Sequence, residues 1–278
     1  MANGTDQTLK TRSVLLTGAS SQIGVFAIPG LLRAGFRVLA VSRKGRPEGY
    51  PSYENVEWLN EAEAIQALES CRYLLSAGPM ELANKFLAAG KQFHHAVVFS
   101  SSSVESKLAS NNPLERKQMQ GLLKLESELR LSAKNNGLKL LILRPTLIYG
   151  CGLDTNISRL AGWIRRFGFM PVNGKAAGLR QPVHADDLAS AAIAAMVSKN
   201  TLPQTLTLAG GSTLSYADMV RGIFTALEKP VRLVHLPQWM FILLMHLLST
   251  IRPGWALNSE MVRRQQIDLV FEDRQARE

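Results

Sequence analysis

Residues 14–46, VLLTGASSQIGVFAIPGLLRAGFRVLAVSRKGR, decide how the chain is interpreted. The run 14–17 is short and apolar, as expected of a buried strand, and 18–24 is a turn rich in small residues. The stretch 25–34 has the pattern of a helix, and 37–41 is a second apolar strand. In such a unit, the backbone N–H groups at the helix N-terminus can bind a pyrophosphate. The stretch therefore predicts the first βαβ unit of a dinucleotide-binding fold.

The spacing of the small residues differs from the three-glycine fingerprint of that fold. Thr17, Gly18 and Gly24 fit the pattern TGxxGxxG, and Ser21 takes the place of its middle glycine. The turn resembles that of the short-chain dehydrogenase/reductase superfamily, where the middle glycine lets the backbone approach the phosphates. A serine hydroxyl can itself donate to a phosphate oxygen. An ordinary strand–helix turn without a ligand is the alternative. The resemblance implies a cofactor site formed by Thr17, Gly18, Ser20, Ser21, Gln22, Ile23 and Gly24.

The residues after the second strand bear on the choice of cofactor. Ser42 and Arg43 follow that strand, and no Asp or Glu occurs between 36 and 47. An acid here would bind the ribose 2′-hydroxyl of NAD, whereas an arginine suits the 2′-phosphate of NADP. We therefore expect NADP rather than NAD. The alternative is that Arg43, Lys44 and Arg46 form a solvated loop tip.

The composition is that of a folded protein with a basic surface. The chain has 278 residues, 46% of them hydrophobic and 19% charged, with a formal net charge of +10. This length suits one large α/β domain, alone or with a small partner domain. The charge favours anionic ligands such as nucleotides or nucleotide-sugars. Because the basic residues are scattered rather than clustered with aromatic residues, we do not expect nucleic-acid binding.

The cysteines and the N-terminal segment indicate a cytoplasmic protein. Cys71 and Cys151 have no metal-ligand spacing, so no metal site is predicted, and a reducing compartment is the simple expectation. Residues 1–12 have no apolar core and so do not form a signal peptide. We expect them to be a disordered arm.

One strongly apolar run, WMFILLMHLLSTI at 239–251, has 13 residues. A membrane span needs about 20 apolar residues, so this run is too short to cross a bilayer unaided. A core helix or a subunit interface, as in a homodimer, is one interpretation. An interfacial helix at a membrane surface, next to basic residues, is the other.

Two further strands are expected to end near the cofactor. Residues 56–59 precede Asn60, which either contacts the adenine amino group, as the resemblance implies, or caps the following helix. Residues 72–76 precede Ala77 and Gly78, and small residues at this place let the backbone run beside the cofactor. A tight turn would explain that glycine equally well.

A serine run follows the fifth predicted strand, 96–100. In the extended members of the superfamily, such a run supplies a hydroxyl that hydrogen-bonds the substrate oxygen. The resemblance assigns this role to Ser102.

The superfamily also carries Tyr-x-x-x-Lys on the next helix, where the lysine binds the nicotinamide ribose and the tyrosine exchanges a proton with the substrate. The matching positions here are Gln120 and Lys124. Glutamine can only donate or accept hydrogen bonds. Either another group, such as Tyr149, Glu105 or a water relayed through Ser102, replaces the tyrosine, or this chemistry is lost. Lys124 could also be one member of a surface charge pair.

The sixth predicted strand, 139–143, runs into a second signature. The segment LRPTLIYG at 143–150 resembles the LRPxxxYGxG motif of the extended family, in which the backbone around Pro145 passes the nicotinamide carboxamide. A later segment, RQPVHADDL at 180–188, resembles a motif whose arginine grips a substrate diphosphate. The expected substrate contacts are therefore Tyr149 and Arg180.

These motifs predict an α/β fold, a Rossmann-type doubly wound parallel sheet with a small C-terminal substrate lobe. Residues 13–150 would form the dinucleotide-binding core, and 151–278 the remaining core elements interleaved with the lobe. The resemblance, to nucleoside-diphosphate-sugar epimerases and dehydratases, implies an NAD(P)-dependent oxidoreductase, epimerase or dehydratase acting on a nucleotide-sugar. A cofactor-binding sensor or assembly subunit without turnover is the alternative, because Gln120 replaces the tyrosine.

Overall fold

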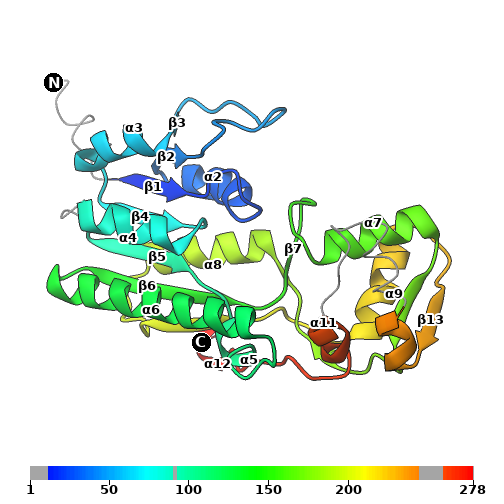
Figure 1. The fold of residues 1–278 in the computed structure, drawn as a ribbon. Coiled ribbons are helices and arrows are strands. Elements are labelled where there is room, and N and C mark those ends of the chain that lie inside the picture. The colour runs from blue at the N-terminus through cyan, green and yellow to red at the C-terminus, as the bar shows by residue number, and fades with distance from the viewer. Residues whose placement is uncertain (1–11, 90–92, 244–258, 278) are drawn as a thin grey trace, which may run out of the picture.

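The computed structural model describes residues 12–89, 93–243 and 259–277. Its centre is a seven-stranded parallel sheet in the order β11-β6-β5-β4-β1-β2-β3 (Figure 1). The strand order reverses between β1 and β4, which places a crevice at the carboxyl ends of these two strands. The predicted doubly wound sheet is therefore confirmed. Its strands are β1 (Ser13–Thr17), β2 (Arg37–Val41), β3 (Val56–Leu59), β4 (Tyr73–Ser76), β5 (His95–Phe99), β6 (Lys139–Pro145) and β11 (Thr205–Leu208).

Helices cover both faces of the sheet. Alternate side chains of β1 point to opposite faces: Leu16 joins one apolar core and Leu15 the other, and both are fully buried. On the first face α2 packs beside α8, and on the second α4 packs beside α6. These helices are α2 (Gly24–Arg33), α8 (Ala185–Val197), α4 (Met80–Ala89) and α6 (Pro113–Asn135).

A proline inside α2 is accommodated by a distant tyrosine. Pro29 has no N–H to donate to the carbonyl of Val25, four residues earlier. The hydroxyl of Tyr50 donates to that carbonyl instead, at 2.7 Å. Burial raises the pKa of Tyr50 to about 12, and the neighbouring Tyr53 adds to this effect, so the hydroxyl keeps its proton.

A smaller lobe is built from chain segments that leave the sheet after β6. Its own apolar core includes Ile164, Val172 and Phe224. The chain returns to the sheet through α8 and β11, so segments of the lobe alternate along the chain with elements of the main fold. The lobe contains α7 (Ile157–Phe167), β8 (Met170–Asn173), α9 (Tyr216–Ala226) and β13 (Leu233–Leu236), with the short pairs β7 (Ile148–Tyr149)–β10 (Val183–His184) and β9 (Leu179–Arg180)–β12 (Leu214–Ser215).

The C-terminal segment runs from the lobe back to the sheet. It begins with α11 (Ser259–Arg264) and ends with α12 (Arg274–Arg277), which contacts the edge strand β11 (Figure 1). This segment therefore joins the two parts of the molecule. The remaining short helices are α3 (Glu61–Gln66), η1 (Leu68–Ser70) and α5 (Ser103–Ser106).

The apolar run 239–251 lies only partly within the described residues. Trp239 is 66% exposed, whereas Phe241 is fully buried against Val262. Residues 244–258, like the arm at 1–11, are outside the described part of the chain. Within the described part, no helix is long and apolar enough to span a bilayer. The interface and membrane-surface interpretations both stay predictions.

Candidate active site

The turn between β1 and α2 lies against the end of β4. Gly18 has φ +66°, and a Cβ there would come within 2.5 Å of the backbone N of Gly78 and 2.6 Å of the carbonyl carbon and oxygen of Ala77. A Cβ on Gly24 would lie 2.2 Å from the carbonyl oxygen of Gly18. Both glycines are therefore required by the close packing of this turn, at the point where the strand order reverses.

The serine in the turn caps the helix that follows. The Ser21 hydroxyl accepts a hydrogen bond from the N–H of Gly24 at 3.1 Å, and the Ser21 carbonyl accepts from Val25. The N–H groups of Gln22 and Ile23 have no hydrogen-bond partner among the described residues. The buried side-chain oxygen of Gln22 also has none. Free amides at a helix N-terminus fit the pyrophosphate of a dinucleotide.

Hydroxyl groups connect this turn to the neighbouring strands. Thr17 donates to Ser76 at 2.8 Å in the buried floor of the crevice. Ser20 and Ser42 are hydrogen-bonded at 3.0 Å, so the end of β2 is tied to the turn. Arg43 is exposed at the rim. The geometry brings together the predicted cofactor residues of β1, β2 and β4.

Asn60 acts as a helix cap. Its side-chain oxygen accepts from the backbone N–H groups of Ala62 and Glu63, at 2.9 and 3.0 Å. The Glu63 carboxylate in turn accepts from the N–H of Asn60 at 2.8 Å, which completes a capping box. Of the two interpretations for Asn60, the structure shows the cap.

The serine run lies beside the LRP segment. The N–H of Ser100 donates to the carbonyl of Leu143 at 2.7 Å, and that of Ser102 donates to the carbonyl of Pro145 at 3.1 Å. Ser102 is buried, and its hydroxyl makes no hydrogen bond to another described residue. The predicted substrate-orienting serine and the predicted carboxamide-binding segment therefore meet at the carboxyl ends of β5 and β6.

Among the described residues, neither Gln120 nor Lys124 forms a hydrogen bond with the turn or the serine run. Both are exposed on α6, and the ammonium of Lys124 lies 3.9 Å from the carboxylate of Glu128. The face that α6 buries is set instead by Glu126, Leu129 and Ala133. Residues two positions apart on a helix point about 200° away from each other. With Glu126 inside, the Lys124 side chain lies on the exposed side of α6, where it forms the charge pair that was the alternative for it, and its predicted role at the nicotinamide ribose stays a prediction.

Glu126 is a buried anchor that sequence analysis missed. Its carboxylate accepts from Ser100 at 2.6 Å, from Arg144 at 2.6 and 3.0 Å, and from Arg130 at 2.9 Å. Burial alone would raise the pKa of Glu126, but the hydrogen bonds from Arg144 and Ser100 hold it below its usual value. The unpaired arginine in the buried strand of the LRP motif was the available signal, because a buried charge needs a partner.

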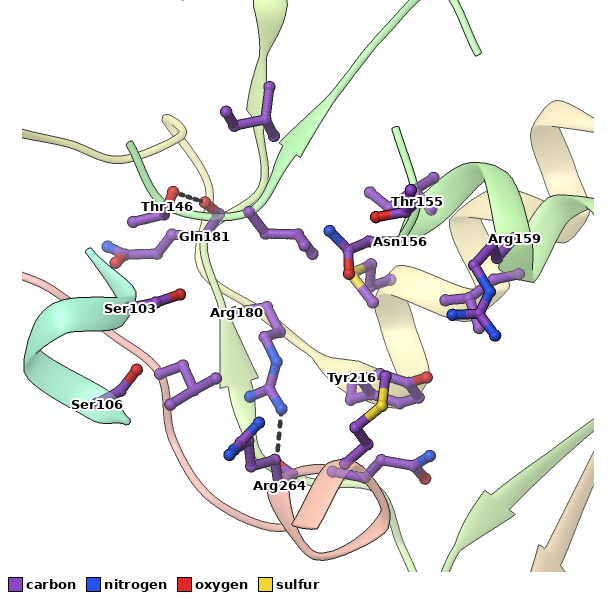
Figure 2. Close-up of a pocket in the computed structure, with 18 of the residues that line it drawn as sticks. Ser103, Ser106, Thr146, Thr155, Asn156, Arg159, Arg180, Gln181, Tyr216 and Arg264 are labelled. Carbon is purple, nitrogen blue, oxygen red and sulfur yellow. Dashed lines mark hydrogen bonds between the residues drawn. The ribbon is translucent and has the colours of Figure 1, made fainter. Parts of the chain in front are cut away.

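A cavity of about 710 Å³ lies between the carboxyl ends of the strands and the small lobe. Its walls come from α5, from the LRP segment, from α7 and α9, and from the C-terminal segment. Figure 2 shows Ser103 and Ser106 on one side of the cavity and Arg159 on the other. The charged residues that line it are Lys107, Glu115, Arg159, Arg180 and Arg264.

Arg180 lines this cavity but is held by backbone carbonyls. Its guanidinium donates to the carbonyl oxygens of Leu179 at 2.6 Å, Ile267 at 2.8 Å and Arg264 at 2.5 Å (Figure 2). It also lies over the ring of Tyr216, at 5.7 Å from the ring centre. Burial lowers the pKa of Arg180. The hydrogen bonds of Arg180 therefore hold the C-terminal segment against β9.

A second arginine is committed to an ion pair. Arg264 donates to both carboxylate oxygens of Glu115, one of them at 3.0 Å, and Ser110 donates to the same carboxylate at 2.6 Å. The hydrogen bonds from Arg264 lower the pKa of Glu115 despite its partial burial. The pair joins the C-terminal segment to α6 at the edge of the cavity.

Tyr149 and Glu105 lie outside the cavity. Tyr149 is 36% exposed and packs edge-on against the ring of His184, at 5.1 Å. Glu105 is exposed and pairs with Arg144 at 3.2 Å. His184 caps α8, because its Nδ1 accepts from the N–H of Asp186 at 3.2 Å. None of the described residues groups into a cluster that could hold a metal ion.

Comparison with known proteins agrees with this architecture. No family model matches the chain. A UDP-glucose 4-epimerase of Vibrio cholerae is 28% identical over 123 residues, 44% of this chain and 38% of that protein. The uncharacterized protein y4nG of Sinorhizobium fredii is 26% identical over 216 residues, 66% of this chain and 53% of its own length. The chain thus matches about half or less of the length of these curated relatives.

Solved structures resemble the chain over most of its length. The epimerase Mth375 of Methanothermobacter thermautotrophicus matches with a TM-score of 0.70 at 16% identity, over 98% of this chain and 87% of that one. The UDP-glucuronic acid 4-epimerase of Bacillus cereus, in complex with UDP-glucuronic acid and NAD, matches with a TM-score of 0.67 at 16% identity, over 81% and 86%. The fold that the resemblance implied is therefore confirmed: this chain has the fold of the solved epimerases to which it is similar.

Proposed function

We propose that this protein is a nicotinamide-dinucleotide-dependent enzyme of the epimerase or dehydratase type, acting on a nucleotide-linked sugar. The observation that carries the proposal is the cavity at the carboxyl ends of the strands, next to the glycine-bearing turn. Four cationic side chains and one carboxylate line it. Such a charge balance favours an anionic ligand such as a nucleoside diphosphate.

The turn would hold the cofactor through the free amides of Gln22 and Ile23, with Ser21 shaping the start of α2. When bound, the cofactor supplies reversible hydride transfer. Ser102 would orient the substrate oxygen with its uncommitted hydroxyl. A role without turnover is not favoured, because the cavity and the serine run are both retained beside the turn. A cytoplasmic location fits the exposed free thiol of Cys151.

The preference between NAD and NADP is open to a direct test. Arg43 led us to expect NADP, but NAD is the cofactor named in the complex of the Bacillus cereus epimerase. Arg43 is exposed, and the structure gives it no hydrogen bond or ion pair with another described residue. We therefore propose NAD as the cofactor.

Fluorescence titration with NADH and NADPH tests the proposal. We expect saturable binding of NADH, and weaker or equal binding of NADPH. In the variant Arg43→Gln, affinity for NADPH alone would fall if Arg43 reads a 2′-phosphate, and Arg46→Gln serves as the control. Absence of saturable binding of either nucleotide would refute the proposed function. A sugar substrate is then found by following reduction of bound NAD at 340 nm with a panel of nucleotide-sugars.

A further inference from the structure

The cations that line the cavity are not equally available to a ligand. Arg180 is committed to three backbone carbonyls, and Arg264 is paired with Glu115. Lys107 and Arg159 also line the cavity, but among residues 12–89, 93–243 and 259–277 neither makes an ion pair or a side-chain hydrogen bond. These two side chains are the ones whose charges a ligand can meet.

Lys107 and Arg159 come from opposite parts of the fold. Lys107 directly follows α5 and belongs to the sheet side, four residues after Ser103. Positions i, i+3 and i+4 share one helix face, so Lys107 lies on the same face as Ser103 and Ser106. Figure 2 shows those serines and Arg159 of α7 on opposite sides of the cavity. The two free cations therefore face a ligand at two separate points.

Lys107 is the more consequential of the two because it is half-buried. Burial lowers the pKa of its ammonium, Glu115 partly opposes this, and Arg264 adds to it. Burial of the Lys107 ammonium is unfavourable when no carboxylate forms an ion pair with it, because nearby Glu115 is paired with Arg264 instead. It becomes favourable when a ligand brings a negative charge to it, beside the serine run and Ser102.

We propose that the cavity binds a nucleotide-linked sugar acid, with the diphosphate at Arg159 and the sugar carboxylate at Lys107. The proposal rests on the proposed function, because it names the substrate class of the same cavity. A diphosphate carries charge at the middle of such a ligand, and an acidic sugar carries a second charge at one end. Lys107 and Arg159 place two positive charges at separate points of the cavity wall, whereas a neutral sugar would bring no negative charge to Lys107.

Isothermal titration of the NAD-loaded protein with UDP, UDP-glucose and UDP-glucuronic acid tests this assignment. We expect UDP-glucuronic acid to bind about tenfold or more tightly than UDP-glucose, as a charge-assisted hydrogen bond implies. In Lys107→Gln this advantage disappears, while binding of UDP itself is unchanged. In Arg159→Gln all three ligands weaken to a similar extent.

Matched controls separate these effects from a general loss of charge. Lys117→Gln on α6 and Arg165→Gln on α7 remove exposed cations that do not line the cavity, and both should bind like the wild type. Equal affinity of the wild type for UDP-glucose and UDP-glucuronic acid would overturn the sugar-acid assignment. Unchanged UDP affinity in Arg159→Gln would overturn the diphosphate assignment. If the protein bound NADH but none of the three nucleotides, this inference would fall while the cofactor half of the proposed function stood.

Discussion

Replacement of Glu126 by glutamine should destabilise the protein much more than the same replacement at a surface position of the same helix. The Glu126 side chain is fully buried and accepts four hydrogen bonds, three of them from Arg144 and Arg130. Glutamine keeps the shape, but it presents an N–H₂ group where arginine donors point. It also leaves Arg144 with only the exposed Glu105 as a charged partner.

The expected cost follows from the burial of the carboxylate. Breaking a buried ion pair by removing one partner costs about 3–5 kcal/mol. We expect about 3 kcal/mol for Glu126→Gln, because Arg144 keeps Glu105 and Arg130 is partly exposed to water. For a chain of this size, that corresponds to a fall in melting temperature of about 6 °C or more.

The matched control is Glu128→Gln. Glu128 is about half exposed, lies 3.9 Å from Lys124 and accepts one hydrogen bond from Asn84. Such a surface pair contributes less than about 1 kcal/mol. Urea and thermal unfolding followed by circular dichroism measure both variants. Equal destabilisation of the two would show that Glu126 does not anchor the strand ends.

The difference between wild type and Glu126→Gln should also depend on pH. The folded-state pKa of Glu126 is held below its usual value. Its stabilisation is therefore fully present above the unfolded pKa, about 4.3, and is lost as the pH falls through the folded pKa. The gap in unfolding free energy should be constant near pH 7 and narrow below about pH 4. A gap that widened on acidification would contradict the assignment.

Three further substitutions test the turn, the proline-containing helix and the cap. Gly24→Ala should lower the free energy of unfolding by at least about 2 kcal/mol and abolish NADH binding, because a Cβ there would lie 2.2 Å from a carbonyl oxygen. In Gly211→Ala, the control, the Cβ meets open space, so thermal unfolding and NADH fluorescence titration should give wild-type values. Tyr50→Phe should cost about 1 kcal/mol in urea unfolding through the lost hydrogen bond to the helix carbonyl, whereas a similar loss in Tyr53→Phe would count against this reading. Asn60→Ala should lower the free energy of unfolding by about 1 kcal/mol without weakening NADH binding. A weaker affinity for NADH would instead support the interpretation that Asn60 contacts the adenine.

The sheet and the turn could be predicted because their signals are local. The alternation of apolar strand, turn and helix from residue 14 onward needs no distant contact, and neither does the spacing of Gly18 and Gly24. In the structure these two positions require glycine, because the backbone of neighbouring segments comes too close for a Cβ. The capping role of Asn60 was also visible, because Glu63 stands three residues later.

The orientation of α6 could not be read in the same way. Charged residues occur on several faces of this helix, so the periodic spacing of apolar residues that would predict its buried face is weak. Sequence position alone left Lys124 either a cofactor ligand or one member of a surface charge pair, and it did not single out Glu126 as buried. Only the approach of Arg144 and Ser100 from two neighbouring strands reverses that interpretation.

Arg180 lines the cavity, but its hydrogen bonds to backbone carbonyls could not be predicted from the sequence, for a related reason. A motif places an arginine near a substrate diphosphate, but it does not show which other groups compete for its five N–H donors. The competing carbonyls of Arg264 and Ile267 lie more than 80 positions along the chain. Contacts between residues so far apart in the sequence depend on how the C-terminal segment packs against the lobe, and no local sequence pattern predicts them.

The position of Glu126 also explains how α6 can lack the tyrosine of the family motif and expose the matching lysine while the cavity is retained. The helix contributes through a carboxylate that fixes Ser100 and Arg144, and these residues lead directly to Ser102 and Pro145 at the cavity. The geometry of the strand ends therefore does not depend on the residues at 120 and 124. On the proposal made above, substrate recognition would instead be divided between cations on the two sides of the cavity. A substitution on the exposed face of α6, such as Lys124→Gln, should accordingly leave nucleotide affinity unchanged, whereas Glu126→Gln should weaken it even under conditions where the protein stays folded.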